Sequence, residues 1–161
     1  MYMKKIVAIS AAAMLLAACG TQKGQTGPNK PPNKGNTQEV HLIWKSLENK
    51  WKLKFGNGQE QDPKTAKTTL APTVGPTKFI VDIAGKSVTF KDPDGLTVWE
   101  NSKSGPPGST QILGPEITKG GKLVFYDLNY GNSVTIYYSL NLSDGSSVDP
   151  IIDNGGGTWL R

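Results

Sequence analysis

Apolar and polar residues alternate along much of this chain, and this alternation predicts β-strands. Trp51, Leu53 and Phe55 alternate strictly with lysines. A period of two places successive side chains on opposite faces of a strand. Residues 40–44 alternate in the same way, and the polar residues 46–49 supply a turn between the two segments. The two segments are therefore predicted to form a β-hairpin.

A helical stripe is the competing interpretation of the same region, because five apolar side chains also recur at helical spacing. They are Val40, Ile43, Trp44, Leu47 and Trp51. The strict period of two in residues 50–55 is not explained by a helix. The hairpin is therefore the preferred prediction.

Residues 133–142 form the longest alternating segment and predict the longest strand. One face carries Val134, Ile136, Tyr138, Leu140 and Leu142. The other face carries Thr135, Tyr137, Ser139 and Asn141. Since the first set is mainly aliphatic, it is predicted to face the core, and Tyr137 is predicted to lie on the more polar face.

Further β-rich segments are short and regularly spaced. They are residues 78–83, 87–91, 96–100, 110–113, 122–128 and 146–152. Turn-forming residues separate them, as in Asp92-Pro93-Asp94-Gly95, where proline presets φ and glycine tolerates φ > 0. The sequence contains no long amphipathic helical pattern. It predicts one all-β domain over residues 39–161, folded as an antiparallel β-sandwich.

The strand at 134–142 is followed by an Asp-Gly turn and by the sequence Ser-Val-Asp-Pro-Ile-Ile-Asp-Asn at 147–154. With these features, residues 89–154 resemble small bacterial sandwich proteins of the DP-EP kind. The resemblance implies a cupredoxin-like or immunoglobulin-like fold. It brings no assigned activity.

The first 20 residues predict where the protein is located. Lys4 and Lys5 precede an apolar run at 6–16, which is too short to span a bilayer and is typical of a signal peptide. The run ends in Leu-Ala-Ala-Cys-Gly at 16–20. This order of features resembles the lipobox of bacterial lipoproteins, in which the cysteine becomes the first residue of the mature chain. It implies a lipoprotein signal peptide at residues 1–18.

The resemblance also implies acyl chains on Cys19, which is the only cysteine, so no intramolecular disulfide competes for it. Several chains, at about 0.8 kcal/mol per buried methylene, anchor a protein stably. Gly20 resembles the residue found there in outer-membrane lipoproteins, since aspartate favours inner-membrane retention. The expected location is thus the cell envelope, lipid-anchored in the outer membrane. A secreted protein cut after Ala18, with a free cysteine, is the alternative.

Residues 19–38 are predicted to be the lipidated cysteine and a flexible tether, because 20–38 contain no aromatic, aliphatic or acidic residue. Five of the 18 basic residues precede Glu39, and all 13 acidic residues lie from Glu39 onward. The domain is therefore formally neutral, although the whole chain carries +5. Nucleic acid is not an expected partner, because binding it requires a basic surface.

The residue inventory argues against several chemistries. A blue-copper site needs two histidines and a thiolate, and often an axial methionine. His41 is the only histidine, and Met1, Met3 and Met14 all lie in the predicted signal peptide. The same count argues against zinc, and no Gly-x-Ser-x-Gly nucleophile motif is present. No cofactor and no enzymatic activity are expected.

Four aspartates are the candidates for calcium binding or for action on carbohydrate, because their oxygens suit Ca²⁺ and paired carboxylates cleave glycosidic bonds. They are Asp92, Asp94, Asp149 and Asp153. The first three lie beside proline or glycine or both, and Asp153 precedes Asn-Gly-Gly, so a role in turns is favoured.

Exposed aromatic side chains are the remaining candidates, since flat rings stack on sugars and on protein surfaces. The residues proposed for such binding are Trp99, Tyr137 and Trp159, with burial in the core as the alternative. The sequence thus predicts a membrane-anchored envelope lipoprotein with a non-catalytic binding or structural sandwich. Its expected partners are the membrane and an envelope protein or glycan.

Overall fold

The structure is a computed structural model that describes residues 35–156. The predicted signal peptide, Cys19 and Trp159 lie outside these residues. Every regular element between residues 35 and 156 is a β-strand, and the strands form two sheets. The all-β sandwich predicted from the sequence is confirmed.

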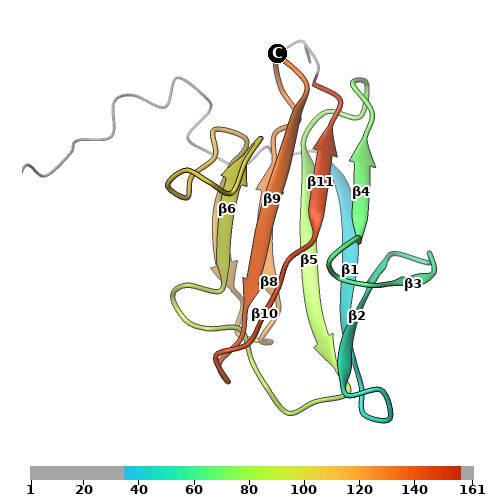
Figure 1. The fold of residues 1–161 in the computed structure, drawn as a ribbon. Coiled ribbons are helices and arrows are strands. Elements are labelled where there is room, and N and C mark those ends of the chain that lie inside the picture. Colours follow the sequence, from blue (N-terminus) through green and yellow to red (C-terminus); the bar gives the residue numbers. More distant parts are fainter. Residues whose placement is uncertain (1–34, 157–161) are drawn as a thin grey trace, which may run out of the picture.

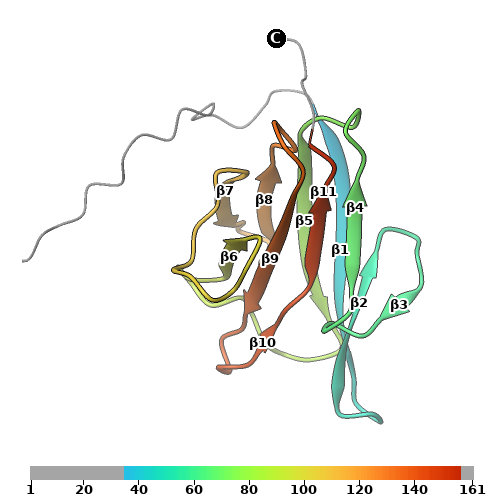
Figure 2. The ribbon, with the colours of Figure 1, turned by 45° about the horizontal axis from the view of Figure 1, so that its top comes forward.

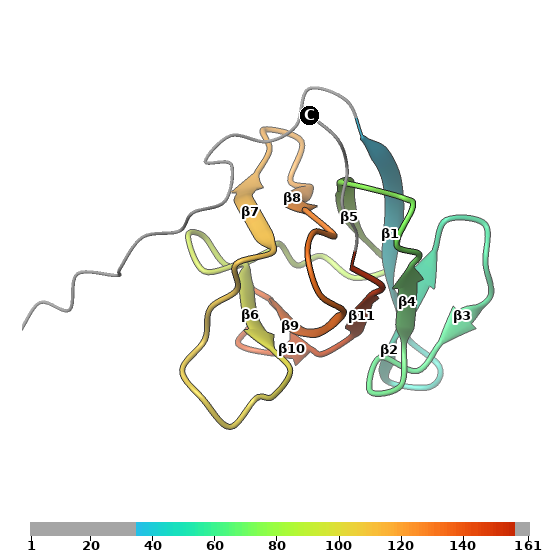
Figure 3. The same cartoon turned by 90° about the horizontal axis from the view of Figure 1, so that it is seen from above.

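The first sheet has six strands. Their order is β3 (Glu60–Gln61), β2 (Lys50–Phe55), β1 (Asn36–Lys45), β5 (Thr77–Ala84), β8 (Leu123–Asp127) and β7 (Ile112–Ile117). The second has five, with the order β10 (Ser147–Val148), β9 (Val134–Asn141), β11 (Ile151–Asn154) and β4 (Lys67–Leu70), while β6 (Leu96–Glu100) pairs with β9. From above, the two layers face each other (Figure 3).

Strands β1 and β2 form the predicted hairpin, so the helical alternative is wrong. The two strands are antiparallel, with Trp44 opposite Trp51. The inward side chains of Val40, Leu42 and Leu53 are completely buried. The lysines of β2 occupy the opposite face, as the period of two requires.

Two strand pairs are parallel, which the turn pattern did not predict. β1 runs parallel to β5 through eight register pairs, and β11 runs parallel to β4. In Figures 1 and 2, β4 lies beside β11, while β1 lies beside β5 in the layer behind. Short turns specify antiparallel neighbours only, whereas a parallel pair needs a long connection. The intervening β2, β3 and β4 supply that connection between β1 and β5.

The predicted boundary of the tether at residue 38 needs a correction, because β1 begins at Asn36. Residues 36–38 pair with the start of β5, and the backbone N–H of Asn36 donates to the Pro76 carbonyl at 3.0 Å. Their side chains are polar and mostly exposed, so their composition resembles a linker. Strand pairing uses backbone groups, which composition does not report.

Other segments also differ from the prediction. Residues 87–91 form only an isolated bridge, between Phe90 and Leu142, instead of a strand. The strand predicted at 146–152 is divided into β10 and β11 by Asp149 and Pro150, since proline lacks the N–H that a ladder needs. The short β3 lies between residues 55 and 67, where the alternation of apolar and polar residues predicted no strand.

The core contains inward side chains of both sheets. The rings of Phe79 and Phe125 stack at a centroid distance of 5.0 Å, and Tyr138 from the opposite sheet lies 5.8 Å from Phe125. In β9, Ile136, Tyr138 and Leu140 are completely buried. The predicted inward face of this strand is confirmed.

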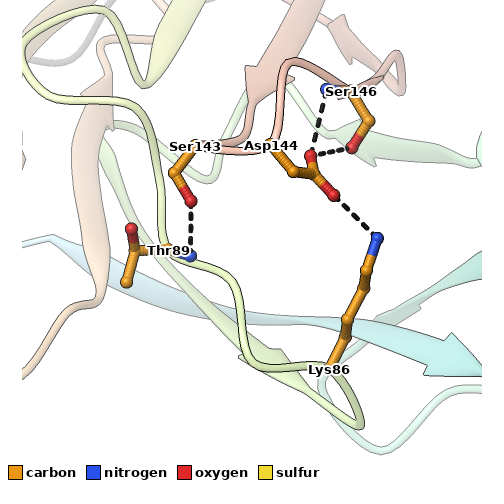
Figure 4. A network of polar contacts seen from close by, with 5 residues as sticks. All are labelled: Lys86, Thr89, Ser143, Asp144 and Ser146. Atoms are coloured by element: carbon orange, nitrogen blue, oxygen red, sulfur yellow. Dashed lines mark hydrogen bonds and ion pairs between the residues drawn. The ribbon is translucent and has the colours of Figure 1, made fainter.

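Lys86 lies in the connection after β5 and contacts the turn that follows β9 (Figure 4). Its ammonium is 2.7 Å from an Asp144 carboxylate oxygen and 4.6 Å from the ring centroid of Trp44. The hydrogen bond from Lys86 lowers the pKa of Asp144. Beside this pair, the Thr89 N–H donates to Ser143 Oγ at 3.2 Å. These contacts join the connection after β5 to the turn after β9.

Replacing Ile136 with alanine is expected to lower the free energy of unfolding by roughly 2–5 kcal/mol, because the change removes buried surface and leaves a cavity. Tyr137→Ala should cost clearly less, since Tyr137 is only half-buried on the opposite face. Urea denaturation of both variants measures the difference. A larger loss for Tyr137→Ala would contradict the assignment of the two faces.

Candidate functional site

The outer face of the second sheet carries a row of large side chains. Trp99 of β6 lies opposite Tyr137 of β9, and Tyr137 lies opposite Ile151 of β11. All three are half-buried. Lys67 of β4 follows opposite Ile151. We call these four residues the aromatic row, and it contains two of the three aromatic residues singled out from the sequence.

A row of polar residues lies beside the aromatic row on the same face, two positions away on each strand. We call it the polar row. Thr135 is opposite Asp153, and Asp153 is opposite Thr69. Asn101, directly after β6, extends this row, because its N–H donates to the Thr135 carbonyl at 2.7 Å. Its side-chain oxygen accepts from the Thr135 N–H at 3.2 Å. Asparagine is suited to this site, since Asn101 has a φ of +59°.

The polar row lines a cavity of about 340 Å³. Lys67 Nζ lies 2.5 Å from one carboxylate oxygen of Asp153, and Thr135 Oγ1 donates to the other at 3.1 Å. These hydrogen bonds, that of Lys67 first, lower the pKa of Asp153. The cavity therefore has both hydrogen-bond donors and acceptors on its wall.

A second polar row lies on the other side of the aromatic row. Thr97 is opposite Ser139, whose hydroxyl donates to Asp149. The other carboxylate oxygen of Asp149 is 3.1 Å from Lys103 Nζ. That ammonium also lies 5.3 Å from the ring centroid of Trp99. The Lys103–Asp149 pair thus connects this row to the aromatic row.

Glu100 fixes the loop that carries Lys103. One of its carboxylate oxygens accepts hydrogen bonds from the Thr110 N–H at 2.5 Å and the Gln111 N–H at 3.2 Å. The Gly108 N–H donates to the Val98 carbonyl at 2.7 Å. Both ends of the loop are therefore attached to β6. This brings Lys103 next to Trp99, a contact that sequence spacing alone did not indicate.

The four aspartates proposed for calcium do not gather at one site in the described part of the chain. Asp92 is exposed, and Asp94 is 3.5 Å from Lys91. Asp149 and Asp153 pair with different lysines, as described above. Within residues 35–156, no three His, Cys, Asp or Glu side chains form a group that could hold a metal ion.

The chain's single histidine, His41, lies on a central strand of the first sheet and faces away from the core. His41 Nδ1 is 2.7 Å from Asp82 Oδ1. Asp82 is also 3.9 Å from Lys122 Nζ. His41 belongs to β1, which has neighbours on both sides, and its side chain is 33% exposed.

A buried polar cluster between the sheets was missed by the sequence reasoning. Asp127 is fully buried, and its Oδ1 accepts from Asn154 Nδ2 at 2.7 Å and from the Asn129 N–H at 2.8 Å. Asp127 Oδ2, Asn154 Oδ1 and the Tyr138 hydroxyl are buried without a hydrogen-bond partner in the described part of the chain. The available signal was the alternation of Leu123, Phe125 and Asp127, which places all three on one face.

Burial raises the pKa of Asp127 to about 6, and the charge of Glu100 acts in the same direction. The hydrogen bonds from Asn154 and Asn129 act against the shift. Burial also raises the pKa of Tyr138. The cluster is buried between the two sheets.

Comparison with known proteins identifies no family, because no family model matches the chain. No curated protein matches it either. Among residues 35–156, no helix is long and apolar enough to cross a membrane.

The buried Asp127 is expected to make stability depend on pH. Because its pKa is higher in the folded state, its stabilising contribution is greatest below about pH 4 and is lost as the pH rises through about 6. The loss should be about 3 kcal/mol, since one pKa unit corresponds to about 1.4 kcal/mol. Asp127→Asn removes this titration, so its stability relative to the native protein should rise between pH 4 and pH 7.

Urea denaturation at pH 4, 5.5 and 7 tests this expectation. Glu39→Gln is the control, since Glu39 is exposed and should leave the pH profile of the native protein unchanged. A constant difference between Asp127→Asn and the native protein across these pH values would show that Asp127 does not titrate in this range.

Proposed function

We propose that this chain is an envelope lipoprotein, anchored in the outer membrane through acyl chains on Cys19, with a non-catalytic sandwich that binds a protein or a glycan. The order of charged, apolar and small residues before Cys19 supports the anchor. The observation that carries the binding role is the juxtaposition of Trp99 and Tyr137 on the outer face of the second sheet. Half-exposed aromatic residues are enriched at recognition surfaces.

The spacing of the carboxylates supports binding over glycoside cleavage. Asp153 contacts Thr135, and Asp149 contacts Ser139 four residues further along β9. Four residues of strand span about 13 Å. The acid and base of glycosidases lie roughly 5–10 Å apart. Each carboxylate is also already paired with a lysine, which further supports a non-catalytic surface.

Cys19→Ser is expected to abolish labelling with a fatty-acid analogue and to remove the protein from the membrane fraction, because the acyl acceptor is lost. Gly20→Asp should retain the label and shift the protein toward the inner membrane. Metabolic labelling and sucrose-gradient fractionation measure both effects. Unchanged membrane retention of Cys19→Ser would refute the anchor.

A photo-crosslinking amino acid in place of Tyr137 is expected to form adducts with an envelope component in intact cells. The same substitution at Tyr126 is the control, since Tyr126 is half-buried on the outer face of the other sheet and has a lysine over its ring. Gel shifts after irradiation measure the adducts. Equal adducts at both sites, or none at Tyr137, would count against a binding role for the second sheet.

A further inference from the structure

We propose that the outer face of the second sheet binds an uncharged oligosaccharide, with one sugar ring on the aromatic row and the next in the adjacent cavity. This inference rests on the proposed function and specifies its ligand. It follows from three properties of that face, namely its arrangement in rows, the groups lining the cavity and its charge.

The arrangement in rows suits a chain of rings. Along β9, Tyr137 in the aromatic row and Thr135 in the polar row are two residues apart, which corresponds to about 7 Å. A sugar ring presents an apolar face that stacks on an aromatic side chain, and it presents hydroxyl groups at its edge. Adjacent rows of aromatic and hydrogen-bonding side chains therefore match both parts of a short oligosaccharide.

The lining of the cavity suits hydroxyl groups. Five of its lining residues have polar side chains that suit hydroxyl groups, namely Thr69, Asn101, Ser133, Thr135 and Asp153. Its volume of about 340 Å³ lies at the lower end of the range for small-ligand sites. The Asp153 side chain is 31% exposed, so its oxygens remain accessible beside Lys67. A hydroxyl group can donate to such a carboxylate and accept from a neighbouring donor.

The charge of the face favours a neutral ligand. Among the described residues, the ionisable side chains beside the aromatic row and the cavity form two pairs, Lys67 with Asp153 and Lys103 with Asp149. Each pair cancels its own charge, so neither a polyanion nor a polycation gains a net attraction. In contrast, the outer face of the first sheet presents the lysines of β2. A large protein interface is less well matched, since the core of such an interface is depleted of charged residues.

Lys103 covers part of Trp99 in the structure, with its ammonium 5.3 Å from the ring centroid. Its side chain is 37% exposed and lies on the loop held by Glu100. On binding, the ammonium keeps its contact with Asp149 and donates to a sugar oxygen at the edge of the aromatic row. Tyr137 then provides the main stacking surface, with Trp99 beside it.

Titration calorimetry of the purified full-length protein tests this inference. The neutral probes are hexasaccharides of glucose, xylose, mannose and N-acetylglucosamine, and the charged probes are hexagalacturonate and chitosan hexamer. At least one neutral probe should bind at concentrations up to about 1 mM. Tyr137→Ala and Trp99→Ala should each weaken that binding by about tenfold or more.

Asp153→Asn is the second test, because it changes charge and hydrogen bonding at nearly constant volume, and it should weaken binding by about threefold or more. The matched controls lie on the other sheet. Tyr126→Ala and Asp82→Asn should leave binding unchanged, and the Asp82 side chain is 32% exposed, against 31% for Asp153. Circular dichroism confirms that each variant is folded.

The outcomes separate the two proposals. If no neutral hexasaccharide binds while crosslinking at Tyr137 still yields a protein adduct, the glycan inference is wrong and the binding role stands. If both experiments are negative, both proposals fail. Tighter binding of a charged probe than of any neutral probe overturns the inference. So does a neutral probe whose binding is unchanged by the Tyr137 and Asp153 substitutions, or is weakened equally by the control substitutions on the first sheet.

Discussion

The pairing register of β9 is the constraint on which most of this structure depends. β9 has neighbours on both sides, with β6 on one edge and β10 and β11 on the other. Its inward residues complete the core, and its outward residues supply the centre of both the aromatic row and the polar row. A shift by one residue would exchange the two faces, so the core and the outer surface are specified together.

Polar contacts join the two sheets, or their connecting turns, near both ends of β9. Asp127 of the first sheet bonds Asn154 of the second near the start of β9, and the Asn129 side chain contacts the Ala71 carbonyl and the Gly156 N–H. Beyond the other end, Lys86 contacts the turn after β9. A buried carboxylate with an unpartnered oxygen costs stability, because it loses its hydration. The contact between Asp127 and Asn154 nevertheless favours one alignment of the two sheets over others.

The alternation of apolar and polar residues predicted the parts of the fold that are determined by neighbouring residues in the sequence. The faces of β9 and the β1–β2 hairpin followed from the period of two and from turn residues. The parallel pairing of β1 with β5 did not, because it depends on a connection of about 30 residues through both sheets. For the candidate site, the outward orientation of Tyr137 was predictable from the alternation in β9. The pairing of Lys67 with Asp153, 86 positions apart, requires the three-dimensional structure.

The pairing of β1 with two neighbouring strands affects how the domain would respond to mechanical force. β1 begins at Asn36 and is paired along its length with β5 and with β2. A pulling force applied to the chain at Gly35, along the axis of β1, would load the hydrogen bonds of β1 to β5 and β2 in shear. Many of these bonds would then bear the force together, instead of opening one by one. A ligand held on the second sheet would pull against this resistant strand. Under the proposed function, tension between the anchor and a ligand on the second sheet would load β1 in this way.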